Sequence, residues 1–504
     1  MSSDVLIAGA GPTGLVLALW LTKQGVKVRI VDKAQAPAQA SRALAVQART
    51  LELYRQLGIA DEVVARGHKV PAVNLWVKGA PKARIRFEVI GEGLTPYPFL
   101  LTFPQDAHEK LLADRLSSLG VAVERGLELA GFAETDGGVR AELRSADGQS
   151  QTCEALFICG CDGARSIVRK AIGATFPGGD YRQLFYVADV HASGLAANGE
   201  LHIDLDEADF LAVFPISDDG RVRLVGTVRD EPREGVEGLE FKDVSTRAID
   251  NLKVKVEAVN WFSTYRVHHR VADRFRQGRA FILGDAAHIH SPAGGQGMNT
   301  GIGDAINLAW KLAAVVKGGA PDRLLDSFAA ERMPFARRLV ATTDRVFTFV
   351  TAEGAVADLL RTRLAPLIMP RAAAIEPVRE YIFRTVSQIT LNYRGSPLSQ
   401  GSAGKVHGGD RLPWARADGA DNFGPPGTIG WQAHVYGAAQ GGLRAWCETR
   451  RLPLHVFPYA PAHEAAGLAR DAAYLVRPDA YVALATPDPP AEAMTRYFET
   501  LGLQ

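Results

Sequence analysis

The sequence has no long apolar run and no excess of either charge. None of its apolar stretches approaches the roughly 20 residues that a membrane-spanning helix needs. Lys and Arg number 57 against 56 Asp and Glu, which leaves a net charge of +1 over 504 residues. There is no basic block that would suggest nucleic acid and no acidic tail that would suggest disorder. We therefore expect neither a membrane nor a nucleic acid as a partner.

Cysteine is scarce, and the segment before Asp4 lacks the basic start of a signal peptide. No C-x-x-C pair is formed by the four cysteines, Cys153, Cys159, Cys161 and Cys447. We therefore expect reduced, mostly buried thiols and a cytoplasmic location.

Patterns of metal-dependent and nucleophilic catalysis are also missing. His268, His269, His288 and His290 lack a matched set of carboxylates or cysteines, so we expect no metal site. The sequence contains no Ser-His-Asp order, no Walker loop and no H-E-x-x-H pattern. These absences leave the glycine-rich segments as the main functional signal.

The stretch that organises the chain is residues 284–303, GDAAHIHSPAGGQGMNTGIG. The apolar run of residues 280–283 predicts a buried strand, and Asp285 lies where that strand ends. A glycine-dense loop, residues 292–297, leads into a helix whose apolar positions recur at i, i+3, i+4 spacing over residues 302–316. Glycines let a backbone approach a ligand closely, and the N-terminus of a helix favours electron-rich oxygens. Together these features predict a site for a large, polar, partly anionic cofactor.

The N-terminus supplies a matching half of this site. Residues 5–8 predict a short strand, and residues 9–14, GAGPTG, fit G-x-G-x-x-G and open a helix that runs to about Lys23. Residues 26–31 predict the next strand, and Asp32 follows the glycines by about 20 residues. In this context the glycines would approach a pyrophosphate and Asp32 would accept from a ribose hydroxyl. The agreement of strand, loop, helix, second strand and acid predicts dinucleotide binding.

Three blocks in this order resemble one known family. They are GAGPTGL at residues 9–15, CDGARSIVR at residues 161–169, and the 284–303 block, which continues into DAINLAWKL. The chain resembles the flavoprotein aromatic hydroxylases, the single-component FAD monooxygenases typified by para-hydroxybenzoate hydroxylase, phenol hydroxylase and the polyketide hydroxylases. The resemblance covers residues 4–395.

The resemblance implies an α/β fold with a Rossmann-like FAD-binding domain, an inserted antiparallel-sheet substrate domain and a thioredoxin-like C-terminal domain. The FAD-binding domain is expected to be discontinuous and to comprise residues 1–75, 101–180 and 266–395. The substrate domain is expected to comprise residues 76–100 and 181–265. A Gly- and Ser-rich stretch, residues 395–404, predicts a linker. Residues 405–504 would form the third domain, with a structural or dimer-stabilising role, because Cys447 alone cannot support dithiol chemistry.

For FAD, the resemblance implies contacts from both glycine loops and from polar residues near them. These residues are Gly9, Gly11, Pro12, Thr13, Gly14, Asp32, Lys33, Arg42, Gln105, Asp162, Gly284, Asp285, Gly295, Gly297, Met298 and Asn299. Arg49 is a second candidate beside Arg42, and helix capping is the alternative for Gln105. For Arg165 and Arg169, contact with nicotinamide-cofactor phosphates and salt bridges that brace the loop are both open.

The substrate is expected to lie on the inserted sheet, whose strands are predicted from period-2 alternation and turn residues. The candidate pocket residues are Tyr186, His202, Phe210, Phe214 and Tyr265. Each of them is also a normal core residue. Aromatic candidates favour a planar, largely apolar ligand.

The mechanism that the resemblance implies has three stages. NADPH or NADH reduces bound FAD, O₂ adds to form a flavin C4a-hydroperoxide, and a phenolic or polycyclic aromatic substrate takes up the distal oxygen. Pro292, Gly295, Gln296 and Gly297 are the expected catalytic residues, because a backbone at a helix N-terminus can stabilise negative charge on the flavin N1–C2=O edge. With one dinucleotide fingerprint in the sequence, the choice between NADPH and NADH stays open.

Three other functions remain open on the same fold. The first is Baeyer–Villiger oxygenation, and the second is a flavin-dependent dehydrogenase or oxidase. The third is a flavin-binding protein that sequesters a reactive intermediate. The sequence leaves the oligomeric state open, and a homodimer is one possibility.

Overall fold

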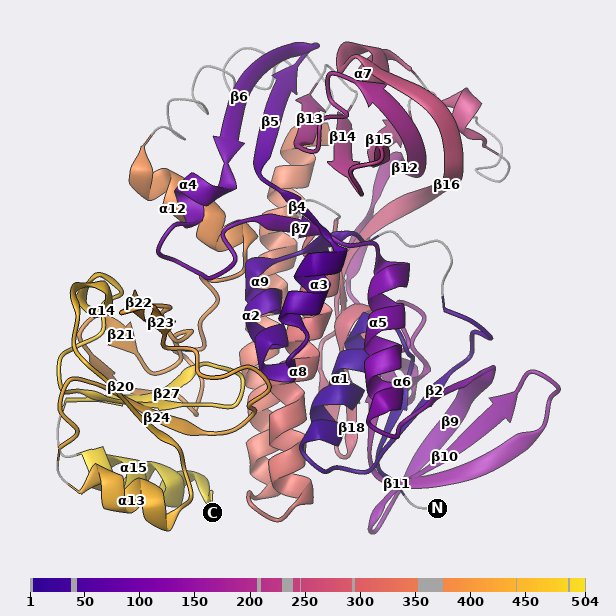
Figure 1. The fold of residues 1–504 in the computed structure, drawn as a ribbon. Coiled ribbons are helices and arrows are strands. Elements are labelled where there is room, and N and C mark those ends of the chain that lie inside the picture. The colour runs from indigo at the N-terminus through magenta and orange to yellow at the C-terminus, as the bar shows by residue number, and fades with distance from the viewer. Residues whose placement is uncertain are drawn as a thin grey trace.

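A parallel sheet forms the base of the molecule (Figure 1). The structure is a computed structural model, and it describes residues 3–37, 43–205, 210–228, 239–244, 246–291, 295–351, 375–440, 442–487 and 490–503. The sheet order is β17-β18-β11-β1-β2-β8. Its strands are β17 (Arg276–Gln277), β18 (Ala280–Ile282), β11 (Ser150–Gly160), β1 (Ser3–Ala8), β2 (Val28–Asp32) and β8 (Val123–Arg125). All these pairs are parallel except β17 with β18, so the predicted α/β class is confirmed.

Helices pack beside this sheet and contribute buried apolar residues to its core. The glycine-opened helix predicted to reach Lys23 is α1 (Pro12–Lys23), whose residues 14–21 are all buried. It packs against α8 (Gly297–Val316) and α5 (Gln105–Ser118). The other helices of this part are α2 (Ala48–Leu57), α3 (Ala60–Arg66), α6 (Ile167–Ala171), α9 (Asp326–Thr351) and α12 (Glu376–Val386). A hairpin, β9 (Leu127–Thr135) and β10 (Gly138–Ser145), extends the sheet from β11.

A second, eight-stranded sheet lies above the first one in Figure 1. Its order is β19-β16-β12-β15-β14-β13-β5-β6. The strands are β19 (His288–Ile289), β16 (Val254–Val271), β12 (Gly178–Gly194), β15 (Arg221–Val228), β14 (Phe210–Pro215), β13 (Leu201–Leu205), β5 (Ala72–Val77) and β6 (Ala80–Arg86). A short helix, α7 (Arg247–Asn251), contributes to the core on one face.

Two expectations about this sheet were wrong. The sheet is not purely antiparallel, because β13 pairs in parallel with β5, and these strands come from two separate segments of the chain. The predicted boundaries at residues 180/181 and 265/266 fall inside β12 and β16. These two strands pair along most of their length, with an irregularity between Asp180 and Leu184, and each strand extends to both sides of its boundary.

A small sheet, β3 (Ala45–Val46), β7 (Leu100–Thr102) and β4 (His68–Val70), lies between the two large sheets. Helix α4 (Phe87–Gly91) lies between β6 and β7 along the chain. Within the described ranges, no helix combines the length and the apolar character needed to cross a membrane.

The C-terminal region forms a third sheet of order β21-β20-β27-β26-β24-β25. Its strands are β20 (Gln400–Ala403), β21 (Val406–His407), β24 (Gln432–Tyr436), β25 (Leu454–Phe457), β26 (Ala473–Val476) and β27 (Val482–Thr486). It also contains the hairpin β22 (Arg416–Ala417)–β23 (Ala420–Asp421) and the helices α13 (Leu443–Thr449), α14 (Pro461–Ala465) and α15 (Pro490–Leu501). The predicted linker at residues 395–404 was wrong, because β20 lies within it and pairs with β27.

Candidate cofactor site

Four sequence motifs meet at one edge of the parallel sheet. Strands β18, β11, β1 and β2 are parallel neighbours, so their carboxyl ends lie side by side. The residues that end or follow these strands are Gly284 and Asp285, Asp162, Gly9, and Asp32 and Lys33. In open α/β sheets, ligands bind at this edge. The sheet order therefore brings together segments that are up to about 275 positions apart, as Gly9 and Gly284 are.

The three glycines of the first loop have different surroundings. Gly9 has φ +101°, and a Cβ there would overlap the Cys161 carbonyl oxygen, while a Cβ at Gly14 would overlap the carbonyl oxygen of Gly9. A Cβ at Gly11 would meet nothing within 4 Å. Gly9 and Gly14 are thus required by internal packing, whereas Gly11 borders open space at the start of α1, where a ligand can approach the backbone.

Asp32 connects β2 to this glycine loop. Its Oδ2 accepts a hydrogen bond from Ala10 N at 2.6 Å, and its Oδ1 accepts from Ala34 N at 2.8 Å. Arg125 Nη1 lies 3.8 Å from Oδ2. A carboxylate offers about four acceptor positions, so Asp32 can still accept from a hydroxyl. The neighbouring Lys33 is exposed.

The two glycine loops pack directly on each other through Thr13. A Cβ at Gly284 would lie 2.7 Å from Thr13 Oγ1, and a Cβ at Gly301 would overlap the same atom. Gly284 has φ +57° and begins a turn that contains the exposed Asp285. The close approach of α1 and α8 thus depends on small residues on both sides.

A buried carboxylate that sequence reasoning missed holds this arrangement together. Asp304 accepts from Gly284 N (3.0 Å) and Arg332 Nε (2.6 Å), and its Oδ2 lies 2.6 Å from His288 Nε2. Burial alone would raise the pKa of Asp304, but Arg332 and His288 hold it below its ordinary value. The signal in the sequence that could have identified Asp304 was a charged residue at the start of the largely apolar stretch DAINLAWKL.

Asp162 carries an unused acceptor at the same edge. Its Oδ2 accepts from Ile167 N (2.7 Å) and Val168 N (3.3 Å). Among the described residues nothing donates to its Oδ1, which is buried. Buried acceptors are nearly always paired in proteins, so this atom is suited to a ligand hydroxyl.

The arginines of the same motif divide into two kinds. Arg169 donates to the carbonyl oxygens of Ala286 (2.9 Å) and Ala164 (2.7 Å) and lies over the Phe176 ring. It therefore braces the loop through main-chain carbonyls, whereas the second of the two alternatives had expected salt bridges. Arg165 is exposed.

The loop before α8 uses its side chains within the protein. Asn299 Oδ1 accepts from Gln47 N (2.9 Å) and Thr50 Oγ1 (2.7 Å), and its Nδ2 donates to the carbonyl oxygens of Ala45 and Gly295 (both 2.9 Å). Gln296 Nε2 donates to the Val386 carbonyl at 2.9 Å. The side chains at these two positions are therefore engaged within the protein, and a cofactor contact would come from main-chain N–H groups of the first helical turn, where Met298 lies.

The remaining cofactor candidates lie close by or outside the described residues. Gln105 Nε2 donates to Glu109 Oε1 at 2.7 Å, so its side chain is engaged within α5. Arg49 is buried and donates to Glu52 and to the Asp479 carbonyl. Arg42 and Pro292 lie outside the described residues.

The second sheet separates the five substrate candidates between its two faces. Phe210, Phe214 and Tyr265 lie on the face that also carries Phe185, whose ring centroid is 6.1 Å from that of Tyr265. This face meets the small sheet, because Phe214 packs in a cluster with Ala45. The same face carries Arg223, which binds Asp189 through two hydrogen bonds (2.6 and 2.7 Å) and donates to the Ala43 carbonyl (3.2 Å).

Tyr186 and His202 lie on the opposite face. Tyr186 is buried in the cluster that includes α7 and contacts the rings of Phe241 and Phe262. His202 Nδ1 accepts from Trp76 Nε1 at 3.0 Å, and burial lowers the pKa of His202 to about 4. Since side chains alternate between faces along a strand, these two residues belong to the core under α7. They do not lie on the face that carries Phe210, Phe214 and Tyr265.

Three comparisons with known proteins agree on the family. Residues 2–343 match the sequence model of a family described as FAD binding domain. The 6-methylpretetramide 4-monooxygenase of Streptomyces rimosus is 40% identical over 433 residues, covering 82% of this chain and 75% of that protein. The structure of an anhydrotetracycline hydroxylase from Streptomyces rimosus superposes with a TM-score of 0.78 at 28% identity over 99% of both chains. A Diels-Alderase of pyrroindomycin biosynthesis superposes with a TM-score of 0.76 at 28% identity over 99% of both chains.

Proposed function

The chain belongs to the FAD-binding-domain family of flavoprotein monooxygenases, and from this premise we propose that it hydroxylates a polycyclic phenolic substrate with NADPH or NADH as reductant. The observation that carries the proposal is a single sheet edge. This edge joins Gly11, the N-terminus of α8 and the buried Asp162 Oδ1, to which nothing donates among the described residues. The aromatic face of the second sheet, which carries Phe214, packs near Ala45. Ala45 in turn accepts a hydrogen bond from Asn299 in the first turn of α8. Relatives that act on tetracycline precursors support a substrate of several fused rings.

The residues at the sheet edge fit FAD. The backbone at Gly11 with the start of α1, beside Pro12 and Thr13, would hold the pyrophosphate, and Asp32 would accept from a ribose hydroxyl, with Lys33 beside it. Asp162 Oδ1 and Asp285 would accept from the ribityl chain. Arg42 and Gln105 remain proposed cofactor contacts, although the side chain of Gln105 is engaged with Glu109.

Bound FAD would supply the redox chemistry, which is electron uptake from the nicotinamide cofactor and activation of O₂. The protein has to orient the ring system, exclude water and stabilise charge. The N–H groups at Gly295, Gln296, Gly297 and Met298 would stabilise negative charge on the N1–C2=O edge, and Pro292 would border the reactive face.

Phe210, Phe214 and Tyr265 would hold the substrate. Their rings offer flat apolar surfaces to a planar ligand, and Arg223 beside Asp189 offers charge at the same face. A thioredoxin-like character of the C-terminal region, its dimer-stabilising role and the three-domain division remain proposals. We propose that the FAD-binding domain and the substrate domain meet at the ends of β12 and β16, and not inside these strands.

The decisive measurement is turnover by the FAD-loaded protein with a panel of polycyclic phenols. We expect a phenol to accelerate NADPH or NADH oxidation and to leave with one added hydroxyl oxygen derived from ¹⁸O₂. Product formed by ring expansion of a ketone would indicate Baeyer–Villiger oxygenation instead. Substrate oxidation without any nicotinamide cofactor would indicate a dehydrogenase or oxidase.

A second candidate function has one specific observation in its favour. The Diels-Alderase that shares this fold shows that a member can be named for a reaction without oxygen transfer. On that reading the protein would bind a reactive intermediate while FAD plays a structural role. Tight binding of a polycyclic ligand without ligand-stimulated nicotinamide oxidation would support it and would contradict hydroxylation.

The proposed FAD site can be tested independently of turnover with a matched glycine pair. Gly11→Val places a side chain where the pyrophosphate would lie, whereas Gly131→Val places one into open space on β9, away from the sheet edge. We expect the Gly11 variant to fold but to purify without flavin absorbance, and the Gly131 variant to retain it. Full flavin occupancy in Gly11→Val would exclude this pyrophosphate position.

A further inference from the structure

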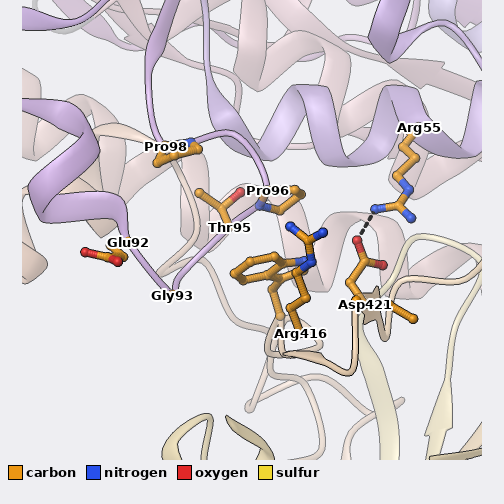
Figure 2. A pocket seen from close by; sticks show the side chains of 11 residues that line it. Arg55, Glu92, Gly93, Thr95, Pro96, Pro98, Arg416 and Asp421 are labelled. Carbon is orange, nitrogen blue, oxygen red and sulfur yellow. Dashed lines mark hydrogen bonds and ion pairs between the residues drawn. The ribbon is translucent and has the colours of Figure 1, made fainter.

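A second pocket, of about 900 Å³, lies at the junction of the C-terminal region with helix α2. Its walls come from α2, from residues 92–98 and from the hairpin β22–β23 (Figure 2). None of the lining residues belongs to the glycine loops or to the aromatic face of the second sheet. The pocket is therefore separate from the site proposed for FAD and substrate.

One end of this pocket carries an excess of positive charge. Arg55 donates to Asp421 Oδ2 at 2.6 Å and to the Gly424 carbonyl at 3.1 Å. Burial alone would raise the pKa of Asp421, but the hydrogen bond from Arg55 lowers it, so the carboxyl is ionised and neutralises one arginine. Arg416 is exposed to the pocket, and among the described residues its guanidinium has no ion-pair or hydrogen-bond partner. One unpaired cation therefore remains.

The rest of the lining is apolar apart from Thr95 and Glu92. Pro96, Pro98, Trp414 and Ala420 present ring and methyl surfaces. Figure 2 shows Glu92 on the opposite side of the pocket from Arg416, Arg55 and Asp421. Flat apolar walls with one cation at one end match a ligand that is an aromatic ring with one negative group.

We propose that this pocket binds an aromatic carboxylate, whose carboxylate pairs with Arg416 and whose ring lies against Trp414 and the two prolines. The planar guanidinium can bind both carboxylate oxygens at once. A nucleoside di- or triphosphate fits less well, because it brings several negative charges to one unpaired cation beside Asp421 and Glu92.

The pocket connects to buried contacts between the C-terminal region and α2. Thr95 Oγ1 donates to Glu52 Oε1 at 2.7 Å, and Arg411 Nε donates to Glu52 Oε2 at 2.8 Å. A ligand in the pocket would contact three segments that are far apart in the chain. Because it would bind only the folded state, it would stabilise that state by RT ln(1 + L/Kd), where L is the free ligand concentration.

The test is calorimetric titration of the FAD-loaded protein with 2-naphthoate, with 2-naphthalenemethanol as the neutral probe. The titration contains no nicotinamide cofactor, so its result does not depend on the proposed monooxygenase activity. Arg416→Ala removes the cation, and Arg444→Ala removes an exposed arginine of α13 outside the pocket as the matched control. Ala420→Trp fills the pocket and keeps the charge.

We expect 2-naphthoate to bind the wild type and the Arg444 variant equally and to bind Arg416→Ala about tenfold or more weakly. Ala420→Trp should abolish binding, and the alcohol should bind the wild type more weakly than the acid. Absence of saturable 2-naphthoate binding, or equal affinity in the Arg416 and Arg444 variants, overturns the proposal.

Discussion

The base of the molecule meets its two other sheets in different ways. At the C-terminal junction, a network of buried charges lies beside an apolar cluster that joins Trp310 to Leu398 and Trp431. Glu331 of α9 is fully buried and accepts from Arg477 (2.6 and 3.0 Å), Lys311 (2.8 Å), Asn307 (2.6 Å) and Ser396 (2.6 Å). Arg477 also binds Asp479, so both residues belong to this network.

At the junction with the second sheet, apolar packing is accompanied by separate polar contacts. Phe214 and Leu201 pack with Ala45 and Leu100 of the small sheet. The polar contacts include Thr102 Oγ1, which donates to the Pro215 carbonyl at 2.6 Å, and Arg223, which donates to the Ala43 carbonyl. The strands β12 and β16 also run directly into this junction.

The difference teaches that the two junctions specify position by different physical means. Buried charges tolerate few arrangements, since each must keep its partners, so they hold the C-terminal region in one geometry against α8 and α9. Apolar contacts are less directional, so the substrate face is positioned mainly by its continuous strands. The following substitutions test this comparison, from the largest expected effect to the smallest.

Glu331→Gln should have the largest effect. The substitution leaves Arg477 and Lys311 buried without a full countercharge, and breaking such a network costs about 3–5 kcal/mol. Urea unfolding followed by circular dichroism measures the loss. Glu380→Gln, in a half-exposed pair with Arg384, is the control and should change stability by less than about 1 kcal/mol. Equal effects of the two variants would contradict the role assigned to the buried network.

Lys311 gives the C-terminal junction a pH dependence. Burial is the largest cause that lowers its pKa to about 8 from 10.5, although Glu331 opposes the shift. The unfolded chain therefore binds more protons than the folded one between these pH values, and stability from this group rises with pH there. The difference in unfolding free energy between the wild type and Lys311→Met should shift in favour of the wild type by up to about 3 kcal/mol as the pH rises from 8 to 10.5. A pH-independent difference would show that Lys311 does not titrate in this range.

Thr102→Val tests the junction with the second sheet. It keeps the shape of the side chain but leaves the Pro215 carbonyl without its donor, which costs about 1–3 kcal/mol. Thr342→Val removes an exposed hydroxyl on α9 that bonds only to its own helix and serves as the control. Thermal unfolding of the FAD-loaded protein distinguishes them. If Thr102→Val were as harmful as Glu331→Gln, the two junctions would not differ as proposed.

Arg84→Ala should have the smallest effect. Arg84 of the edge strand β6 pairs with Glu200, which precedes β13, and the Arg84 side chain is 52% exposed. Solvent screens such pairs, so the unfolding midpoint should not change measurably. A clear loss of stability at low salt that disappears at high salt would show that surface charge matters at this sheet edge.

The parts of the cofactor site that could be predicted depend on neighbours along the chain. Residues 5–8 and 280–283 are apolar runs, and β1 and β18 were found there. Gly9 and Gly11 precede the predicted helix, and α1 begins at Pro12. Local pattern suffices here, because strand, turn and helix N-terminus are each determined by a few adjacent residues.

Other assignments depended on partners that are distant in sequence. Asn299 and Gln296 were predicted from the motif, but their side chains bind residues near positions 45–50 and 386–388. Tyr186 and Phe185 are adjacent, and only the register of β12 with β15 and β16 decides which one lies under α7.

The sequence by itself determined the α/β class, the two glycine loops and the family, because these are carried by short segments whose conformation and chemistry are local. Tertiary structure alone decided which acidic residues are buried with partners, such as Asp304 and Glu331, and which face of the second sheet is left for a substrate. It also created the pocket at Arg416, whose walls come from three separate segments. Burial and pairing are properties of neighbours in space, and the fold sets those neighbours only when distant strands and helices pack together.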